Sequence, residues 1–222
     1  MTHDEPTNFL YPFIDAEEGD PKSLLADLAA SAQAKAAESL ALRHSTLEAN
    51  ADLLEAAATE MARRFAAGGR MFTFGNGGSC TDSTTLARLF ARPPVGRPLP
   101  AWSLTADQAI LTALGNDVGF DLVFTRQLIA RAKAGDIAIA MSTSGNSPNL
   151  LSALAEARQR GLYTIGFAGY DGGAFADNPN VDACFVVRSQ SVHRIQESQA
   201  LLGYRLWLAT HERSGDQGLG AA

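Results

Sequence analysis

A run of small polar residues, Ser142-Thr143-Ser144-Gly145-Asn146-Ser147, separates an apolar segment from a helical one. The preceding segment, Ile137–Met141, is typical of a buried strand, and Pro148 begins a helical pattern that continues to Arg160. Proline suits the first helical position because its missing amide hydrogen would have no intrahelical partner there. Hydroxyls and free backbone amides would therefore converge at a helix N-terminus and form an anion site. No G-x-x-x-x-G-K-[ST] sequence is present, which favours a phosphate monoester over a pyrophosphate.

A second glycine-rich turn, Gly75-Asn76-Gly77-Gly78-Ser79, follows a predicted strand at 71–74 and precedes a predicted helix that ends near Ala91. Glycine permits positive φ angles and lets a ligand approach the backbone. The turn lacks the G-x-G-x-x-G spacing of a dinucleotide site, and no acidic residue ends a strand about 20 residues later. Alone, the turn is equally well explained as a tight turn. Paired with the hydroxyl-rich run, it favours ligand binding, because two such loops on one parallel sheet would face one crevice.

The elements that must position these loops alternate between strand and helix patterns. Strands are expected at 71–74, 101–104, 137–141, 163–167 and 183–187, with helices at 108–114, 122–132, 148–160 and 193–210. This order predicts an α/β fold: a three-layer αβα sandwich with a mainly five-stranded parallel sheet. Two N-terminal helices are expected over 21–67, with a break within 43–49 and an end at Gly68-Gly69.

Length and composition indicate one globular domain. The chain has 222 residues, of which 46% are hydrophobic, enough for a sizeable core. We expect a flexible arm at 1–20, whose apolar segment Phe9–Ile14 packs on its own domain or on a neighbour, one domain at 21–213, and a disordered tail at 214–222. A net charge of −6 argues against a nucleic-acid partner. Neither a signal peptide nor a membrane-spanning stretch is apparent, and Cys80 and Cys184 have the pattern of reduced thiols, so we expect a cytoplasmic protein.

The two loops together resemble those of the SIS (sugar isomerase) domain family, in particular the phosphoheptose (sedoheptulose 7-phosphate) isomerase and DnaA initiator-associating protein group. Three further motifs strengthen the resemblance: Leu114–Phe120, Gly169–Gly173 and Arg194–Glu197. The resemblance extends from about Leu24 to Leu208 and implies the SIS fold. It also implies a homotetramer with sites between subunits, in which the N-terminal helices form a central bundle.

The resemblance implies roles for particular residues. A sugar phosphate would be held by Ser142, Thr143, Ser144 and Ser147, with Gly77, Gly78 and Ser79 contributing from the first loop, while Asn76, Asp117 and Gln196 would contact the sugar chain. For Asp117 a capping or turn role is an equally good interpretation. For Gln196 the equally good alternative is a polar helix residue at an interface.

The chain departs from the family where the isomerases carry their catalytic groups. Aldose–ketose isomerisation needs a base beside the substrate, and the family's glutamate and histidine correspond here to Leu89 and Tyr204. A further histidine that binds zinc in some members corresponds to Thr85. Leucine cannot transfer a proton, and a free tyrosine, with a pKa of about 10, is a poor base at neutral pH. We therefore expect no zinc and no cofactor.

Other residues could supply a base. His193 and Glu197 are the candidates near Gln196, although a surface histidine and a structural glutamate are the simpler interpretations. Asp82, at the start of a helix, is most simply explained by the helix dipole. The positive charges of Arg88, Arg92 and Arg97 could serve an anionic ligand of a neighbouring subunit, but a solvated helix end explains them better.

Three functions follow from these observations. The first is a sugar-phosphate-binding protein without the usual catalytic pair, acting as a sensor or an assembly factor. The second is an active aldose–ketose isomerase, for sedoheptulose 7-phosphate or a related ester, that uses a different base. The third is a scaffold for a protein partner, similar to the DnaA initiator-associating protein. In all three we expect a homotetramer and no direct contact with nucleic acid or membrane.

Overall fold

A five-stranded, fully parallel sheet forms the centre of the computed structural model, which describes residues 21–215. The strands are β1 (Met71–Gly75), β2 (Ala101–Ser103), β3 (Ile137–Met141), β4 (Tyr163–Gly169) and β5 (Ala183–Val187). Their spatial order is β2-β1-β3-β4-β5, and every neighbouring pair is parallel. The predicted α/β architecture and the predicted strands are therefore confirmed.

The central strands are apolar on both sides because helices cover both faces of the sheet. All five residues of β1 and all five of β3 are buried, which is characteristic of a parallel sheet between two helical layers. The two strands pair in register from Met71 opposite Ile137 to Gly75 opposite Met141. Both strands thus end at the same level, and the two loops predicted to bind an anion leave the sheet side by side.

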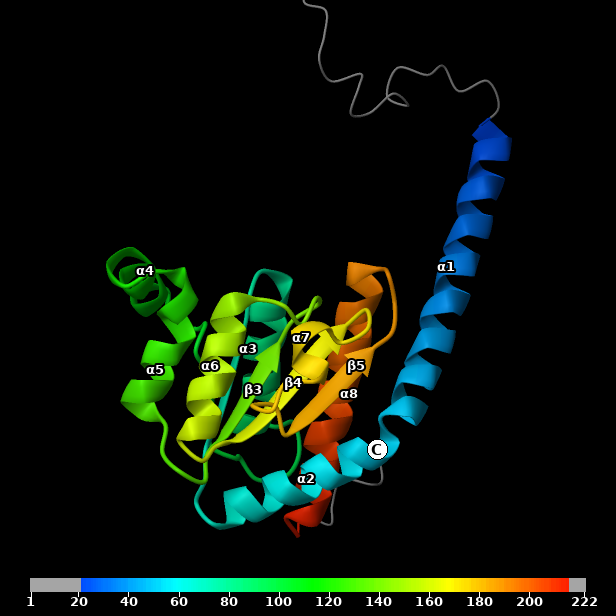
Figure 1. Cartoon of the computed structure of the whole chain (residues 1–222). Helices are drawn as coiled ribbons and strands as arrows, with labels where there is room; N and C mark the ends of the chain where they lie inside the picture. The colour runs from blue at the N-terminus through cyan, green and yellow to red at the C-terminus, as the bar shows by residue number, and fades with distance from the viewer. Residues whose placement is uncertain (1–20, 216–222) are drawn as a thin grey trace, which may run out of the picture. The chain divides into compact units, whose positions relative to one another are not determined.

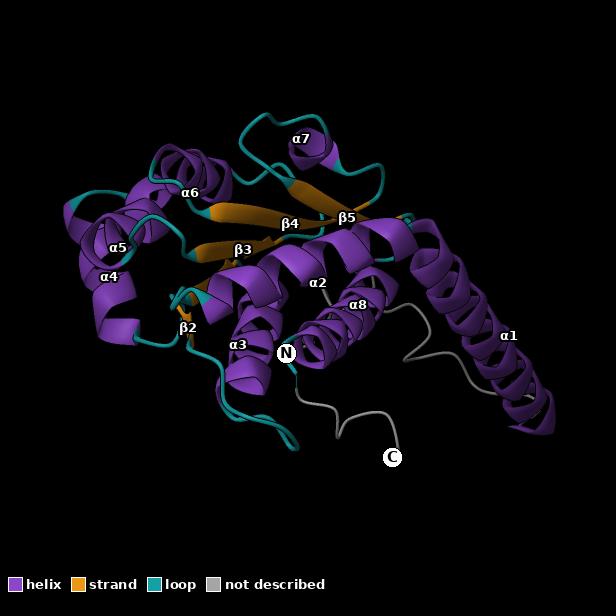
Figure 2. Ribbon diagram, turned by 90° about the horizontal axis from the view of Figure 1, so that it is seen from below, coloured by secondary structure: helices purple, strands orange, loops and turns teal. Residues whose placement is uncertain are grey.

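The two helical layers have separate cores. On one face, α2 (Ala51–Ala66), α3 (Gly78–Ala91) and α8 (Val192–Arg213) pack around residues such as Met61, Phe90 and Trp207. On the other face, α5 (Val123–Arg131), α6 (Pro148–Gln159) and the short α7 (Gly173–Ala176) enclose Phe74, Phe124 and Phe175. Figure 2 shows the sheet between these two layers.

Several boundaries differ from the sequence prediction. The helix α1 (Pro21–Ala49) ends at Ala49, and the break before α2 falls at Asn50, one residue after the expected window of 43–49. The side chain of Asn50 donates to the Val186 carbonyl oxygen of β5 at 3.3 Å, and a tertiary contact of this kind leaves no local sequence signal. The helix α4 (Gln108–Asp117) is longer than expected, a 3₁₀ turn (Phe120–Leu122) separates it from α5, and α7 was not predicted.

The chain divides into two compact units, residues 1–41 and 42–222. Within the first unit the structure describes only residues 21–41, which belong to α1, coloured blue in Figure 1. Leu24, Leu25, Leu28 and Leu40 are exposed on this helix. The expected arm at 1–20 with its apolar segment Phe9–Ile14 lies outside the described residues, as does the tail from 216 onward. Among the described helices, none combines the length and apolar character needed to cross a bilayer.

Strand order places the functional loops at a reversal of the sheet. From β1 the chain passes through α3 to β2 on one side, and later returns to β3 on the other side of β1. In open parallel sheets such a reversal leaves a crevice at the carboxyl ends of the two strands, and ligands bind there. The loops after β1 and β3 are the two loops selected from sequence.

Candidate functional site

The first loop, which follows β1, is locked to the start of α6 by a pair of amides. The Asn76 Nδ2 donates to Asn149 Oδ1 at 2.9 Å, and the Asn149 Nδ2 donates back to Asn76 Oδ1 at 3.0 Å. Asn149 is buried and directly follows Pro148, the first residue of α6. Asn76 therefore ties the two loops together in addition to its expected role toward a sugar.

Glycine is required in this first loop. Gly77 has a φ of +54° and precedes α3 as its N-cap residue. A Cβ at Gly78 would overlap the side-chain amide of Gln196. Ser79 follows within the first turn of α3 and is buried. Gly78 thus allows α8 to approach the loop directly.

The second loop, which follows β3, uses part of its polar groups to hold its own shape. The Gly145 amide donates to Ser142 Oγ at 3.0 Å, and the Asn146 amide donates to Ser144 Oγ at 3.2 Å. The Asn146 Oδ1 accepts from the Ala174 amide of α7 at 2.8 Å. Both loop serines use their hydroxyl oxygen as the acceptor, so each hydroxyl hydrogen stays available to an anion.

Ser147 lies where the second loop joins α6. Ser147 is the N-cap residue of α6, and Pro148 occupies the first turn, as predicted. Within the described residues the Ser147 side chain makes no capping hydrogen bond, so its hydroxyl is not used by the helix. The helix N-terminus and the hydroxyls of the loop therefore favour an anion at the same place.

Helix α8 contacts both loops. The Gln199 Nε2 donates to the backbone carbonyl oxygen of Ser142 at 2.7 Å, and Gln199 is fully buried. One turn earlier on α8, the Gln196 Nε2 donates to Asp82 Oδ2 on α3 at 3.1 Å. Figure 2 shows α3 and α8 next to each other under the same face of the sheet. The structure thus brings Gln196 to the first loop of its own chain, against Gly78.

An open cleft of about 410 Å³ lies between α3 and α8. Gly78 and Asp82 line it from α3, and His193, Gln196 and Glu197 line it from α8. Burial of the Asp82 carboxyl raises its pKa above the ordinary value, and the hydrogen bond from Gln196 offsets part of this rise. The Glu197 carboxylate instead forms an ion pair with Arg43 of α1, with 3.0 Å between Arg43 Nη2 and Glu197 Oε2.

A smaller pocket of about 70 Å³ adjoins the cleft. Asp82, Thr85 and Leu89 line it from α3, and Gln199 and Tyr204 line it from α8. Thr85, Leu89 and Tyr204, which the sequence resemblance sets at the family's catalytic and zinc-binding positions, therefore line one pocket. This donor set does not fit zinc, which prefers imidazole, thiolate and carboxylate ligands in a tetrahedral arrangement. Across residues 21–215, no group of three or more His, Cys, Asp or Glu is placed to hold a metal ion.

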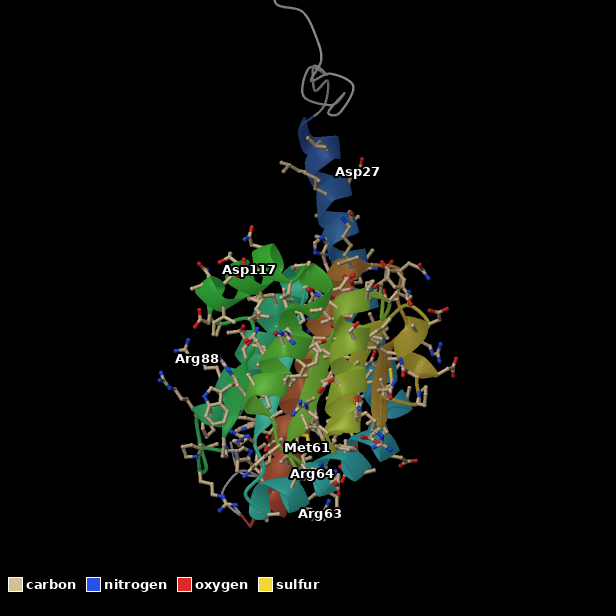
Figure 3. The ribbon with its side chains drawn as sticks, turned by 60° about the vertical axis from the view of Figure 1, so that its left-hand side comes forward. Asp27, Met61, Arg63, Arg64, Arg88 and Asp117 are labelled. Carbon is tan, nitrogen blue, oxygen red and sulfur yellow. The ribbon has the colours of Figure 1, made fainter. Side chains whose placement is uncertain are left out.

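Asp117, Arg88 and Arg92 lie outside the α3–α8 cleft. Asp117 is the exposed last residue of α4, where its Oδ1 accepts from Asn116 Nδ2 at 2.8 Å. Arg88 and Arg92 line a separate hollow beside Trp102, and Figure 3 shows Arg88 on the outer surface. The part of the chain that the structure describes does not bring these three side chains into the α3–α8 cleft.

Sequence reasoning missed two residues of the site, Asn149 and Gln199. Each carried a weak signal. Asn149 is a polar residue directly after the helix-starting proline, and Gln199 lies three positions after Gln196, on the same helix face.

Comparison with known proteins agrees with this geometry. The SIS domain family matches residues 36–169. The phosphoheptose isomerase of Solidesulfovibrio magneticus is 43% identical over 175 residues, which cover 76% of this chain and 82% of that protein. That of Geobacter sulfurreducens is 45% identical over 168 residues, covering 68% and 86% of the two chains.

Solved structures extend the similarity to the fold. The phosphoheptose isomerase of Neisseria gonorrhoeae superposes with a TM-score of 0.75 at 34% identity, covering 81% of this chain and 96% of that one. The phosphoheptose isomerase of Francisella tularensis gives a TM-score of 0.78 at 29% identity, and the superposition covers 83% of this chain and 98% of that one.

Proposed function

Because this chain belongs to the phosphoheptose isomerase family of SIS-domain proteins, we propose that it binds a heptose phosphate and interconverts its ketose and aldose forms. The observation that carries this proposal is the pairing of two loops at the β1–β3 reversal, one rich in glycine and one rich in hydroxyls. The relatives named phosphoheptose isomerase support a seven-carbon sugar phosphate as the substrate.

The phosphate would lie in the second loop. The hydroxyls of Thr143, Ser144 and Ser147, at the N-terminus of α6, would donate to the phosphate oxygens, with Ser79 contributing from the first loop. The hydroxyl of Ser142 accepts from the Gly145 amide, which assigns it to shaping the loop as well. Repeated hydroxyl donors without a lysine suit a monoester dianion.

The sugar chain would then extend along the α3–α8 cleft. Gln196 lines this cleft and would bind sugar hydroxyls, with Asn76 and the backbone of Gly77 and Gly78 at its first-loop end. Asp117 would reach the ligand only from a different position of α4 or from a neighbouring subunit. The proposed homotetramer, with sites between subunits, would allow the second arrangement.

The isomerase function is favoured over a sensor function. Leu89 and Tyr204 remove the family's usual base, but they leave a carboxylate, Asp82, between the cleft and the small pocket. The similarity to phosphoheptose isomerases extends over most of the chain. A protein scaffold would need neither the cleft nor the ordered hydroxyls.

Proton NMR of sedoheptulose 7-phosphate incubated with the protein tests this proposal. We expect new anomeric signals of an aldoheptose 7-phosphate to appear until equilibrium is reached. A substrate that binds, as judged by a thermal shift, and stays unchanged would overturn the isomerase function in favour of the sensor. The absence of both binding and turnover would overturn sugar-phosphate binding as well.

A further inference from the structure

The cleft and the small pocket share one carboxylate. Asp82 lines both cavities, together with Ala200 on the opposite helix. Its Oδ2 accepts the hydrogen bond from Gln196 Nε2 at 3.1 Å, which leaves Oδ1 without a side-chain donor in the described part of the chain. A ligand that extends along the cleft into the small pocket would pass directly beside this carboxylate.

The small pocket contains a polar atom that needs a partner. Gln199 is fully buried, and its Nε2 is used by the Ser142 carbonyl oxygen. Its Oε1 has no hydrogen-bond partner among residues 21–215 and belongs to a side chain that lines the pocket. A buried acceptor of this kind is costly unless a donor satisfies it. The pocket is therefore suited to a hydroxyl group, and about 70 Å³ holds only a small part of a ligand.

We propose that Asp82 is the catalytic base that carries the proton between C1 and C2 of the sugar phosphate. The geometry that points to this role is a half-buried carboxylate between the cleft and a hydroxyl-accepting pocket. The inference rests on the proposed isomerase function and identifies the group that replaces the absent pair at Leu89 and Tyr204.

The reaction is balanced without a further reactant. The Asp82 carboxylate takes a proton from C1 of the ketose, the C1–H electron pair becomes the C1=C2 bond, and the C2 carbonyl oxygen receives the displaced pair. The Asp82 carboxylic acid exchanges its proton with solvent through the open cleft, and the enediolate then takes a proton back from it at C2, while the proton on O1 moves to O2. The C1 carbonyl forms as the C1=C2 bond is lost. Gln199 Oε1 would accept a hydrogen bond from the O1 hydroxyl and so hold C1 toward Asp82.

The other ionisable groups of the cleft are less suited than Asp82 to act as the catalytic base. The Glu197 carboxylate is already engaged in an ion pair with the Arg43 guanidinium. His193 is exposed at the start of α8 and lines only the open cleft. Burial raises the pKa of Asp82 and makes it a stronger base than a free aspartate.

The test is exchange of the C1 proton of sedoheptulose 7-phosphate in deuterium oxide, followed by NMR, for wild type, Asp82→Asn and Asp82→Ser. Asp82→Asn keeps a hydrogen-bond acceptor for Gln196 in a side chain of the same shape. Asp82→Ser replaces the carboxylate by a smaller side chain, so the test can proceed with whichever variant folds. We expect exchange to fall by roughly 100-fold or more, while calorimetric affinity changes by less than about threefold. The matched control is Asp52→Asn, which removes an exposed aspartate from the first turn of α2 and should leave exchange unchanged.

The outcomes separate the two proposals. Wild-type exchange that survives in a folded Asp82 variant would overturn the role of Asp82 and leave the isomerase function intact. No exchange with the wild type would overturn both. Loss of exchange together with loss of affinity in both Asp82 variants would assign Asp82 to binding and overturn its role as the base.

Discussion

The thiol of Cys184 on β5 is a weak nucleophile at neutral pH. Burial raises its pKa to about 11, and the negative charge of Asp177 adds to this rise. Compared with an ordinary thiol pKa of 9.0, this shift leaves about 100-fold less thiolate at pH 8. The thiolate is the nucleophile, so Cys184 has the character of a packing residue.

Alkylation with iodoacetamide, followed by peptide mass spectrometry, checks this assignment. At pH 8, iodoacetamide should modify Cys184 roughly 100-fold more slowly in the folded protein than in the same chain unfolded by guanidinium. Its rate should continue to rise about tenfold per pH unit up to pH 10, because the thiol is still mostly protonated there. Equal rates in the folded and denatured protein would contradict the assignment.

At the scale of residues, local signals predicted the loops and tertiary contacts decided the rest. Ser142–Ser147 was recognisable because hydroxyls, a glycine and a helix-starting proline are adjacent in the sequence. The role of Gln199 was not recognisable from sequence, because it depends on a hydrogen bond to the Ser142 carbonyl oxygen, 57 positions away. Asp82 was assigned to the helix dipole for the same reason: its contact with Gln196 spans 114 positions.

At the scale of elements, the second loop depends on a close approach to the loop after β4. Gly145 has a φ of +67°, and a Cβ there would overlap the backbone carbonyl oxygen of Gly172. Gly68, which follows α2, also has a positive φ of +82°, but a Cβ there would meet nothing within 4 Å. The two glycines thus share the conformational requirement and differ in the packing requirement.

Substitution by alanine separates these two requirements. Gly68→Ala should lower the free energy of unfolding by about 1 kcal/mol, the cost of a left-handed alanine. Gly145→Ala should cost roughly 2 kcal/mol more, because the backbone carbonyl cannot move aside as a side chain would. Urea denaturation gives both values, and equal losses for the two variants would show that the loop–loop contact is not tight.

The elements themselves were largely predictable, and their order in space was not. Each strand is an apolar run that ends at a glycine, a small polar residue or a charge, so its existence could be inferred from sequence. That β1 lies between β2 and β3 follows from packing of the whole sheet. The four-residue helix α7 begins within the glycine-rich segment 169–173, whose composition favours a turn.

At the scale of the molecule, α1 carries exposed apolar side chains. Leu25 and Leu28 are 65% and 56% exposed on this helix. In the proposed homotetramer these leucines would pack against other copies of the chain.

A double substitution, Leu25→Glu with Leu28→Glu, should therefore reduce the molar mass measured by light scattering after size-exclusion chromatography. The glutamates keep helix propensity while placing charge in the proposed contact. An unchanged mass would exclude this face of α1 from the assembly. The exposed pair Asp27→Asn with Lys35→Gln, also on α1, is the control: it removes one charge of each sign, leaves the net charge unchanged and removes no apolar surface.

Binding of a phosphate monoester by the second loop is the claim on which the account depends most. Calorimetric titration of sedoheptulose 7-phosphate and of unphosphorylated sedoheptulose tests it directly, in the wild type, Ser144→Ala and the control Ser214→Ala. We predict that the wild type binds the phosphate ester, that the free sugar binds at least about 100-fold more weakly, and that Ser144→Ala loses roughly tenfold in affinity for the ester. Equal affinities for the two sugars, or an affinity for the ester that Ser144→Ala leaves unchanged, would contradict the account.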